Sequence, residues 1–358
     1  MFDLYSIVRP IIFLIEPEIA HKLILKYLKF INVFYKHNND DPRLKTNVGN
    51  INLSNPIGVA AGFDKNGEAI LGINSLGFGF IEIGSTTPKK QIGNPRPRLF
   101  RLIGDQAIIN RLGFNNIGHK LVLKNVKAVR GKPIILGVNL GANKNSKNFL
   151  EDYLEGLRTF NDFADYIVIN ISSPNTPGIR DLQGKDNLKQ LIDRVLAERK
   201  KINQNGKIVP IILKLSPDLM NSDLKKIIEI SLQKNVDALI ISNTSLARSA
   251  HLSDKEKNQS GGLSGAPIFS ISTKMVALAY KYSSGKLPII GVGGICSGHD
   301  AYEKICAGAS ALQIYTSLVY KGPKLIKVIK KQLLLNLEKD NIKNIKDAVG
   351  CKNSKYLD

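Results

Sequence analysis

The chain has few cysteines and histidines, and none of them shows the spacing of a disulfide framework or a metal site. Its three cysteines, Cys296, Cys306 and Cys351, form no CxxC pair, which predicts a protein of a reducing compartment. The five histidines are scattered, with no HExxH or comparable spacing. We therefore expect no metal bound by protein ligands.

Long apolar segments are also missing. The longest early run, Pro10 to Ile15, is bounded by Arg9 and Glu16. It is far shorter than the ~20 residues that a membrane-spanning helix needs, and no secretory signal is evident. We therefore expect neither a spanning helix nor export.

Acidic residues are scarce relative to basic ones, 30 Asp and Glu against 51 Lys and Arg, which gives a net charge of +21. Nucleic acid, an anionic membrane surface and acidic small molecules are all partners that such a charge would attract. The basic residues are mostly lysines spread along the chain, and a solvated lysine surface without a partner explains them equally well. The net charge alone therefore does not distinguish between these possible partners.

The first 36 residues predict a helical extension. Helical spacing links Leu4, Ile7, Ile11 and Leu14, and a second set links Ile19, Leu23, Ile24, Tyr27, Leu28 and Ile31. Pro17 suits the first turn of the second helix. A polar linker over residues 37–43 follows. The extension is either a packing addition to the main domain or an amphipathic pair that lies on a membrane.

Residues 50–338 predict a (β/α)8 barrel, followed by a tail to residue 358. Eight short apolar runs alternate with helical stretches, which is typical of a parallel sheet buried on both faces. A doubly wound open sheet is the alternative. The runs are Ile57–Gly62, Phe80–Ser85, Ile134–Gly141, Tyr166–Ser172, Val209–Ser216, Ala238–Thr244, Pro288–Gly294 and Ala311–Ser317.

Polar residues or glycines end every one of these runs. In a barrel the carboxyl ends of all strands meet at one face, where barrel enzymes have their active sites. Two lysines, Lys65 and Lys214, enter the strand ends, and a buried ammonium should face an anion unless it reaches solvent. Glycine clusters at 261–265 and 291–294 suggest a phosphate held by backbone N–H groups.

This set of side chains predicts binding rather than hydrolysis. No Ser-His-Asp arrangement and no pair of carboxylates can be assembled, since Asp64 is the one acid found at these strand ends. A site rich in Asn, Ser, Thr and Lys suits an anionic substrate together with an anionic cofactor.

Six motifs resemble those of the class 2 dihydroorotate dehydrogenase family. The similarity extends from residues 16–21 to 347–350, nearly the whole chain, and the motifs together are very specific. They are residues 170–178 (NISSPNTPG), 60–67 (AAGFDKNG), 82–84 (EIG), 93–101 (GNPRPRLFR), 110–115 (NRLGFN) and 261–265 (GGLSG).

The resemblance implies FMN in the barrel mouth and assigns residues to it. Matching the family's flavin positions are Ala61, Gly62, Phe63, Asp64, Lys65, Ser85, Asn139, Asn170, Lys214, Ser242, Gly265, Gly294, Tyr315 and Thr316. Matching its substrate positions are Lys65, Asn110, Arg111, Leu112, Gly113, Phe114, Asn170, Asn175, Asn243 and Thr244. Ser173 matches the catalytic base.

The implied activity is oxidation of (S)-dihydroorotate to orotate in pyrimidine (UMP) biosynthesis. Ser173 takes a proton from C5, with Thr176 as a candidate relay, and FMN receives a hydride from C6. Lys65 pairs with the substrate carboxylate, and Lys214 stabilises charge on the flavin.

The resemblance also implies the electron acceptor and the location. Class 1 members use cysteine where Ser173 stands, so serine together with the N-terminal extension predicts a membrane quinone as acceptor. His21, Arg101 and Tyr315 would border a quinone tunnel. We expect a monomer bound peripherally to the cytoplasmic side of a bacterial inner membrane, without a nucleic-acid partner.

Two other functions remain open at this point. An RNA-modifying flavin barrel of the dihydrouridine synthase type would also be basic, but it would use a cysteine acid and carry a further helical domain. A non-catalytic barrel that binds membrane or nucleic acid through its basic surface is the other. A flavin spectrum that dihydroorotate bleaches would be expected of neither.

Overall fold

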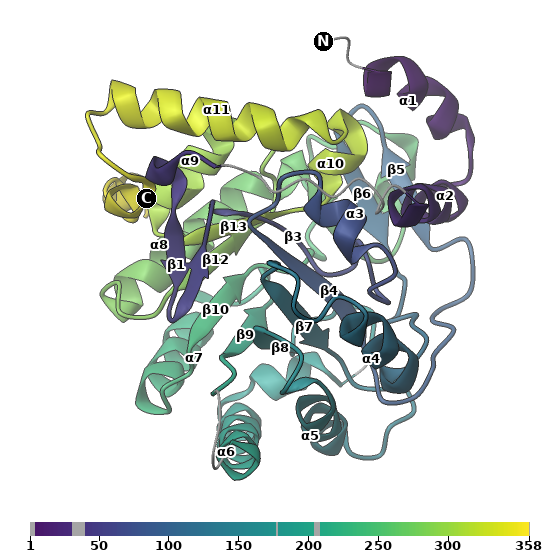
Figure 1. Cartoon of the computed structure of the whole chain (residues 1–358), viewed down its shortest axis with the longest axis vertical. Coiled ribbons are helices and arrows are strands. Elements are labelled where there is room, and N and C mark those ends of the chain that lie inside the picture. The colour runs from purple at the N-terminus through teal and green to yellow at the C-terminus, as the bar shows by residue number, and fades with distance from the viewer. Residues whose placement is uncertain (1–3, 31–39, 177, 204–207, 358) are drawn as a thin grey trace.

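Eight parallel strands close into a barrel in this computed structural model, which describes residues 4–30, 40–176, 178–203 and 208–357. Strand order follows the chain around the ring, as expected when each crossover returns to the neighbouring position. Seven of the eight predicted runs contain one of these strands, and β4 extends one residue beyond the remaining run, to Thr86 (Figure 1). The strands are β3 (Ile57–Val59), β4 (Phe80–Thr86), β7 (Leu136–Leu140), β8 (Tyr166–Asn170), β9 (Ile211–Leu215), β10 (Ala238–Ile241), β12 (Ile289–Val292) and β13 (Ala311–Ile314).

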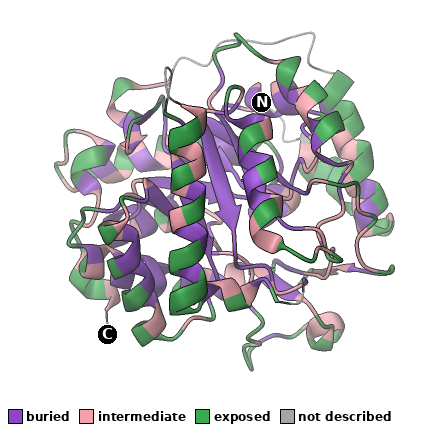
Figure 2. Cartoon of the chain, turned by 90° about the horizontal axis from the view of Figure 1, so that it is seen from below, coloured by how far each residue is buried: buried purple, intermediate pink, exposed green. Residues whose placement is uncertain are grey.

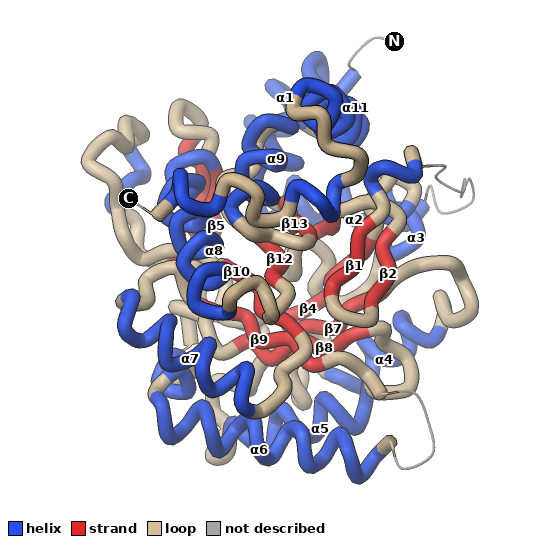
Figure 3. Tube along the Cα trace, turned by 90° about the vertical axis from the view of Figure 1, so that its left-hand side faces the viewer, coloured by secondary structure: helices blue, strands red, loops and turns tan. Residues whose placement is uncertain are grey.

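Helices surround the barrel, with their exposed faces turned outward and the strands buried at the centre (Figures 2 and 3). The predicted (β/α)8 architecture is therefore confirmed, and the open sheet is excluded. The helices are α3 (Ile70–Asn74), α4 (His119–Lys127), α5 (Phe149–Phe160), α6 (Lys185–Ile202), α7 (Asn221–Gln233), α8 (Phe269–Ser283), α9 (Gly298–Ala307), α10 (Thr316–Lys321) and α11 (Lys324–Lys339).

Two small antiparallel sheets lie at opposite ends of the barrel, and the sequence did not predict either. The hairpin of β1 (Thr46–Val48) and β2 (Ile51–Leu53) packs against the inward residues at the amino ends of the strands. At the carboxyl ends, β5 (Leu99–Leu102), β6 (Ala107–Asn110) and β11 (Gly262–Gly265) form a three-stranded sheet. This second sheet brings Asn110 and Gly265 to the barrel mouth.

The N-terminal extension consists of α1 (Leu4–Leu14) and α2 (Pro17–Phe30), as predicted. Ile31 and the linker up to residue 39 lie outside the described residues. A buried ion pair fastens α2 to the barrel: the Glu18 carboxylate receives hydrogen bonds from Arg98 at 2.7 and 2.9 Å. In the described part of the chain, no helix has both the length and the apolar character needed to cross a membrane.

The barrel interior changes from apolar to polar along each strand. Near the amino ends, the rings of Phe80 and Tyr166 fill the space where side chains on Gly58 and Gly137 would otherwise sit. Because strand side chains alternate, the next inward positions two residues further on are Glu82 and Asn139. The apolar filling of the barrel therefore ends with Phe80 and Tyr166, and a polar layer that includes Glu82 and Asn139 follows toward the carboxyl ends of the strands.

Candidate active site

A cavity of about 1150 Å³, counting its open mouth, lies at the carboxyl ends of the barrel strands. Most of the predicted site residues line it: Ala61, Gly62, Lys65, Ser85, Asn110, Leu112, Gly113, Phe114, Asn170, Ser173, Asn175, Lys214, Ser242, Asn243, Thr244, Gly265, Gly294, Tyr315 and Thr316. We call it the mouth cavity.

Four of the predicted flavin and substrate residues lie off the wall of the mouth cavity. The Asp64 carboxylate accepts hydrogen bonds from the backbone N–H groups of Glu68 and Ala69, so it shapes the loop after β3. Arg111 stacks over Phe100 and donates to the carbonyl of Pro97 and to the Gln259 and Ser260 side of the neighbouring loop. Asn139 lies beneath Ser85, and Phe63 faces α2 instead.

A buried carboxylate that the sequence reasoning missed lies below the cavity floor. Glu82 is fully buried in β4, and its oxygens accept hydrogen bonds from Asn139 at 2.8 Å and Gln313 at 2.6 Å. The Lys214 ammonium lies 3.7 Å from Glu82, which answers the expectation that this lysine faces an anion. The signal was available: an acid at an inward position of an otherwise apolar strand must be paired.

Amides and hydroxyls form one continuous network above this layer. Asn170 donates to the Ser85 hydroxyl at 2.9 Å, and Ser85 in turn donates to the Asn139 carbonyl oxygen. Across the cavity, Asn243 donates to the Ser172 hydroxyl at 3.0 Å. Side chains held by two or more bonds present fixed donors and acceptors to a ligand.

Ser173 lies on the cavity wall and is buried, with 5% of its surface accessible. Its oxygen accepts a long hydrogen bond, 3.3 Å, from the backbone N–H of Asn175. The nearby Thr176 hydroxyl is buried and has no hydrogen-bond partner among the described residues. The Ser173 hydroxyl, on the cavity wall, is therefore available to a bound molecule, whereas Thr176 does not line the cavity.

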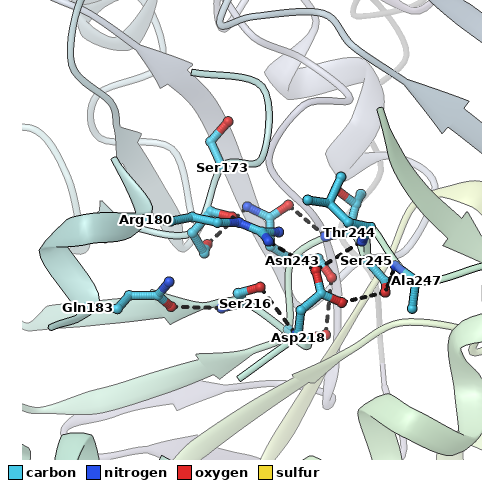
Figure 4. Close-up of polar contacts among 12 residues, drawn as sticks. Ser173, Arg180, Gln183, Ser216, Asp218, Asn243, Thr244, Ser245 and Ala247 are labelled. Atoms are coloured by element: carbon cyan, nitrogen blue, oxygen red, sulfur yellow. Dashed lines mark hydrogen bonds and ion pairs between the residues drawn. The ribbon is translucent and has the colours of Figure 1, made fainter. Parts of the chain in front are cut away.

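An ion-pair network supports the loop that carries Ser173 (Figure 4). Arg180 donates to the Ser172 carbonyl at 3.3 Å and pairs with Asp218 at 3.1 Å. Asp218 also accepts from the Ser245 hydroxyl at 2.5 Å. The loops after β8, β9 and β10 are thereby joined, and Figure 4 shows the Ser173 hydroxyl pointing away from this network.

Lys65 is a second cation, besides Lys214, on the wall of the mouth cavity. Its ammonium donates to the Gly62 carbonyl at 2.9 Å. Burial lowers its pKa to about 8, so the group is charged at neutral pH but loses its proton readily above it.

A smaller cavity lies between α2 and the barrel mouth, and we call it the α2 cavity. His21, Phe63, Lys65 and Tyr315 line it. Lys65 and Tyr315 also line the mouth cavity, so the two spaces share a wall. Burial lowers the pKa of His21 to about 4, and its Nε2 lies 2.7 Å from the Phe63 carbonyl, which makes it a neutral donor.

Arg101 lines neither of these two cavities. It donates instead to the carbonyls of Phe13 and Ile15 at 3.1 and 3.0 Å, and its guanidinium stacks over the Phe13 ring. It therefore holds the turn between α1 and α2, while His21 and Tyr315 lie beside the α2 cavity.

Glycine backbone forms the far end of the mouth cavity. A Cβ on Gly294, which has a φ of +73°, would lie 2.4 Å from Phe269, and one on Gly265 would lie 2.4 Å from the Gln106 carbonyl. Only glycine allows the chain to pass this close. The hydroxyls of Ser264 and Thr316, 2.8 Å apart, lie at the same end. This end suits a phosphate, and the amide network suits a polar heterocycle.

The comparisons with known proteins agree with this geometry. The family model described as dihydroorotate dehydrogenase matches residues 43–337. A protein of Parvibaculum lavamentivorans named dihydroorotate dehydrogenase (quinone) is 47% identical over 349 residues, covering 98% of this chain and 99% of its own. One of the same name from Rhodopseudomonas palustris is 45% identical over 351 residues, with 98% and 96% covered.

Solved structures give the same result. The crystal structure of DHODH from Eimeria tenella in complex with ferulenol superposes with a TM-score of 0.90 at 40% identity, covering 94% of this chain and 95% of that one. The ligand-free form has a TM-score of 0.89 at 41% identity, with 94% and 99% covered. By the family match and by relatives that are similar over nearly their whole length, this chain belongs to the dihydroorotate dehydrogenase family.

Proposed function

We propose that this protein oxidises (S)-dihydroorotate to orotate in pyrimidine biosynthesis and passes the electrons to a membrane quinone. The observation that carries the proposal is the shared wall of the two cavities. Ser173 lines the mouth cavity, and Lys65 and Tyr315 separate that cavity from the one under α2. Substrate oxidation and acceptor reduction can then proceed on opposite sides of one cofactor.

The family is flavin-dependent, and the residues present fit FMN. Gly265 and Gly294 line the mouth cavity, and because glycine has no side chain, their backbone N–H groups can come close to a phosphate. Ser85, Asn170 and Lys214 present a hydroxyl, an amide and a cation to a ring in the mouth cavity. When bound, the flavin would supply the two-electron acceptor chemistry that the oxidation of dihydroorotate needs.

Ser173 is the group we assign as base for the C5 proton. A serine needs a site shielded from bulk water and a route for its own proton. Its burial and the unpartnered Thr176 hydroxyl support both requirements. Thr176 would take the proton onward, and the network from Arg180 to Asp218 would hold the loop in place.

The asparagine side chains of the mouth cavity and Lys65 would orient the substrate. Asn175 donates to the backbone carbonyl of Asn110 at 3.3 Å, which holds the loop after β8 against β6 at the wall of the mouth cavity. Carboxylate and imide oxygens accept from Asn and Lys donors, and imide N–H groups donate to Asn oxygens. The positive charge of Lys65 pairs with the substrate carboxylate, and Asn243 and Thr244 bind the other edge.

The two parts of the chain divide the work. Residues 50–338 would hold FMN and substrate, and residues 1–36 would contact membrane and quinone. The exposed side chains of Ile11, Leu14 and Phe30 support this division, with 64%, 88% and 79% of their surfaces accessible. Apolar residues on a helix pair this exposed suit peripheral insertion at a membrane interface. We place the protein, as a monomer, on the cytoplasmic side of a bacterial inner membrane.

The test is anaerobic titration of the purified holoenzyme with dihydroorotate. We expect the flavin absorption to bleach, and a ubiquinone analogue to restore it faster than fumarate or a nicotinamide. Ser173→Ala should keep the flavin but slow bleaching by roughly 100-fold or more. Ser222→Ala, an exposed serine on α7, is the matched control and should not change the rate. A spectrum that dihydroorotate leaves unchanged would refute the assignment.

A further inference from the structure

A separate pocket of about 830 Å³, counting its open mouth, lies where α1 meets the junction of α10 and α11. Tyr5 and Arg9 reach it from α1, Lys321 ends α10, and Lys324 and Val328 come from the first turns of α11. Figures 1 and 3 both place α1 beside α11 at one side of the barrel. Neither the oxidation of dihydroorotate nor the quinone route uses this pocket.

The charge of this pocket is uncompensated. Three of its lining residues, Arg9, Lys321 and Lys324, are cations, and none of those described is an acid. In the part of the chain that the structure describes, no carboxylate forms an ion pair with any of the three. Cations gathered from three helices without a counter-ion create a strongly positive concavity that attracts an anion.

Backbone contacts hold two of the cations in place. Arg9 donates through one guanidinium nitrogen to the Tyr320 carbonyl at 3.0 Å, and Lys321 donates to the Cys296 carbonyl at 2.9 Å. Asp300, on α9, accepts a hydrogen bond from the backbone N–H of Cys296 at 2.8 Å and does not line the pocket. The remaining N–H groups of Arg9 and both lysines are therefore left for a ligand with several acceptor oxygens.

The surroundings of the pocket indicate where that ligand comes from. On α1, the helix that supplies Arg9, Ile7 and Ile11 are 62% and 64% exposed. A helix whose apolar side chains enter the headgroup boundary brings its polar neighbours to the level of lipid phosphates. Val328, 37% exposed at the pocket edge, offers an apolar contact to the glycerol end of a lipid.

We propose that Arg9, Lys321 and Lys324 bind the phosphate of an anionic phospholipid headgroup and thereby orient the enzyme on the membrane. The proposal rests on the proposed function, since a quinone-reducing enzyme must meet the lipid surface. A free phosphate has the same acceptor chemistry, but the exposed apolar face of α1 favours the lipid.

The test is vesicle binding by the full-length holoenzyme. Phosphatidylcholine vesicles are compared with vesicles that also contain phosphatidylglycerol, for wild type and for the double variant Lys321→Gln, Lys324→Gln. The control, Lys200→Gln with Lys201→Gln, removes the same charge from exposed lysines at the end of α6. Figure 1 places α6 on the opposite side of the barrel.

We expect the affinity of the pocket variant for the anionic vesicles to fall roughly 10- to 30-fold, because each lysine near an anionic lipid surface contributes up to about a factor of ten to binding. The control should lose no more than about threefold, and binding to phosphatidylcholine alone should be equal for all three proteins. Equal losses of affinity in both variants would mean that overall charge alone explains the binding, and would refute the proposed lipid site. So would saturable thermal stabilisation by inorganic phosphate that matches the effect of anionic vesicles.

Flavin bleaching by dihydroorotate, measured on the same preparations, keeps the two proposals apart. Bleaching in all three proteins together with unselective vesicle binding would refute the lipid site alone. Failure to bleach in wild type would refute the proposed function, whatever the vesicles show.

Discussion

The docking of α2 onto the barrel depends on one carboxylate, and its removal should release the helix. Glu18 is 5% exposed and receives two hydrogen bonds from Arg98, which is 4% exposed, and one from the half-exposed Arg96 at 3.0 Å. The bidentate bond from Arg98 is the main reason that the pKa of Glu18 falls from 4.5 to about 2. Glu18→Gln removes this charge while keeping the shape of the side chain.

The pKa gives the magnitude. A fall from 4.5 to about 2 means that the ionised carboxylate is favoured over its neutral form by about 3 kcal/mol in the folded protein. Because this pKa is lowered, the contribution is complete above pH 4.5 and is lost as the pH falls toward 2. At neutral pH, Glu18→Gln should therefore open α2 roughly 100-fold more often, which agrees with the ~3–5 kcal/mol cost of breaking a buried ion pair.

Hydrogen exchange of the α2 amides measures this opening directly. We expect their protection to fall by roughly 100-fold in Glu18→Gln, and quinone reduction to fall more than reduction of a soluble dye, because the α2 cavity depends on α2. Arg96→Gln is the control. Its side chain is 51% exposed, so it should cost about 1 kcal/mol or less. A change in protection below threefold in Glu18→Gln, or equal effects of the two variants, would refute the reasoning.

Three further predictions follow from the site. The pKa of Lys65, about 8, means that its charge is lost as the pH rises through 8. The kcat/KM for dihydroorotate should then fall about tenfold per pH unit above pH 8. In Lys65→Gln, kcat/KM should be low and should not change with pH over this range. Parallel pH profiles of the two proteins would contradict the pairing of Lys65 with the substrate carboxylate. Asp218→Asn should lower kcat by roughly 10- to 100-fold through displacement of the Ser173 loop with flavin content unchanged, and normal turnover would exclude that role. Deleting residues 1–35 should abolish quinone reduction but not flavin bleaching, and full quinone activity would disprove the tunnel.

Much of this protein could be read from the sequence because its signals are local. Buried parallel strands are continuous apolar runs, so eight runs predicted eight barrel strands. Helical spacing placed α1 and α2 to within a residue or two. The motif around Ser173 is contiguous, and its position at the end of β8 follows from the strand alone.

Only the tertiary structure shows the contacts between residues that are far apart in the sequence. Nothing local links Glu82 to Lys214, 132 positions away, or Arg180 to Asp218 and Ser245, so neither network could be predicted. The sheet of β5, β6 and β11 joins segments more than 150 residues apart. Its strands are short and lack the long apolar runs from which the barrel strands were predicted.

Side-chain direction was also beyond the sequence. Asn110 and Leu112 line the mouth cavity on either side of Arg111 in the sequence, yet the guanidinium of Arg111 turns toward Phe100 and Gln259. Arg101 likewise binds the turn between α1 and α2 rather than a cavity. The sequence by itself determined which chemical groups reach the barrel mouth, because strand ends converge there. Only the folded chain decided which of them point inward, because rotamers and partners are set by neighbours that come from other strands and loops.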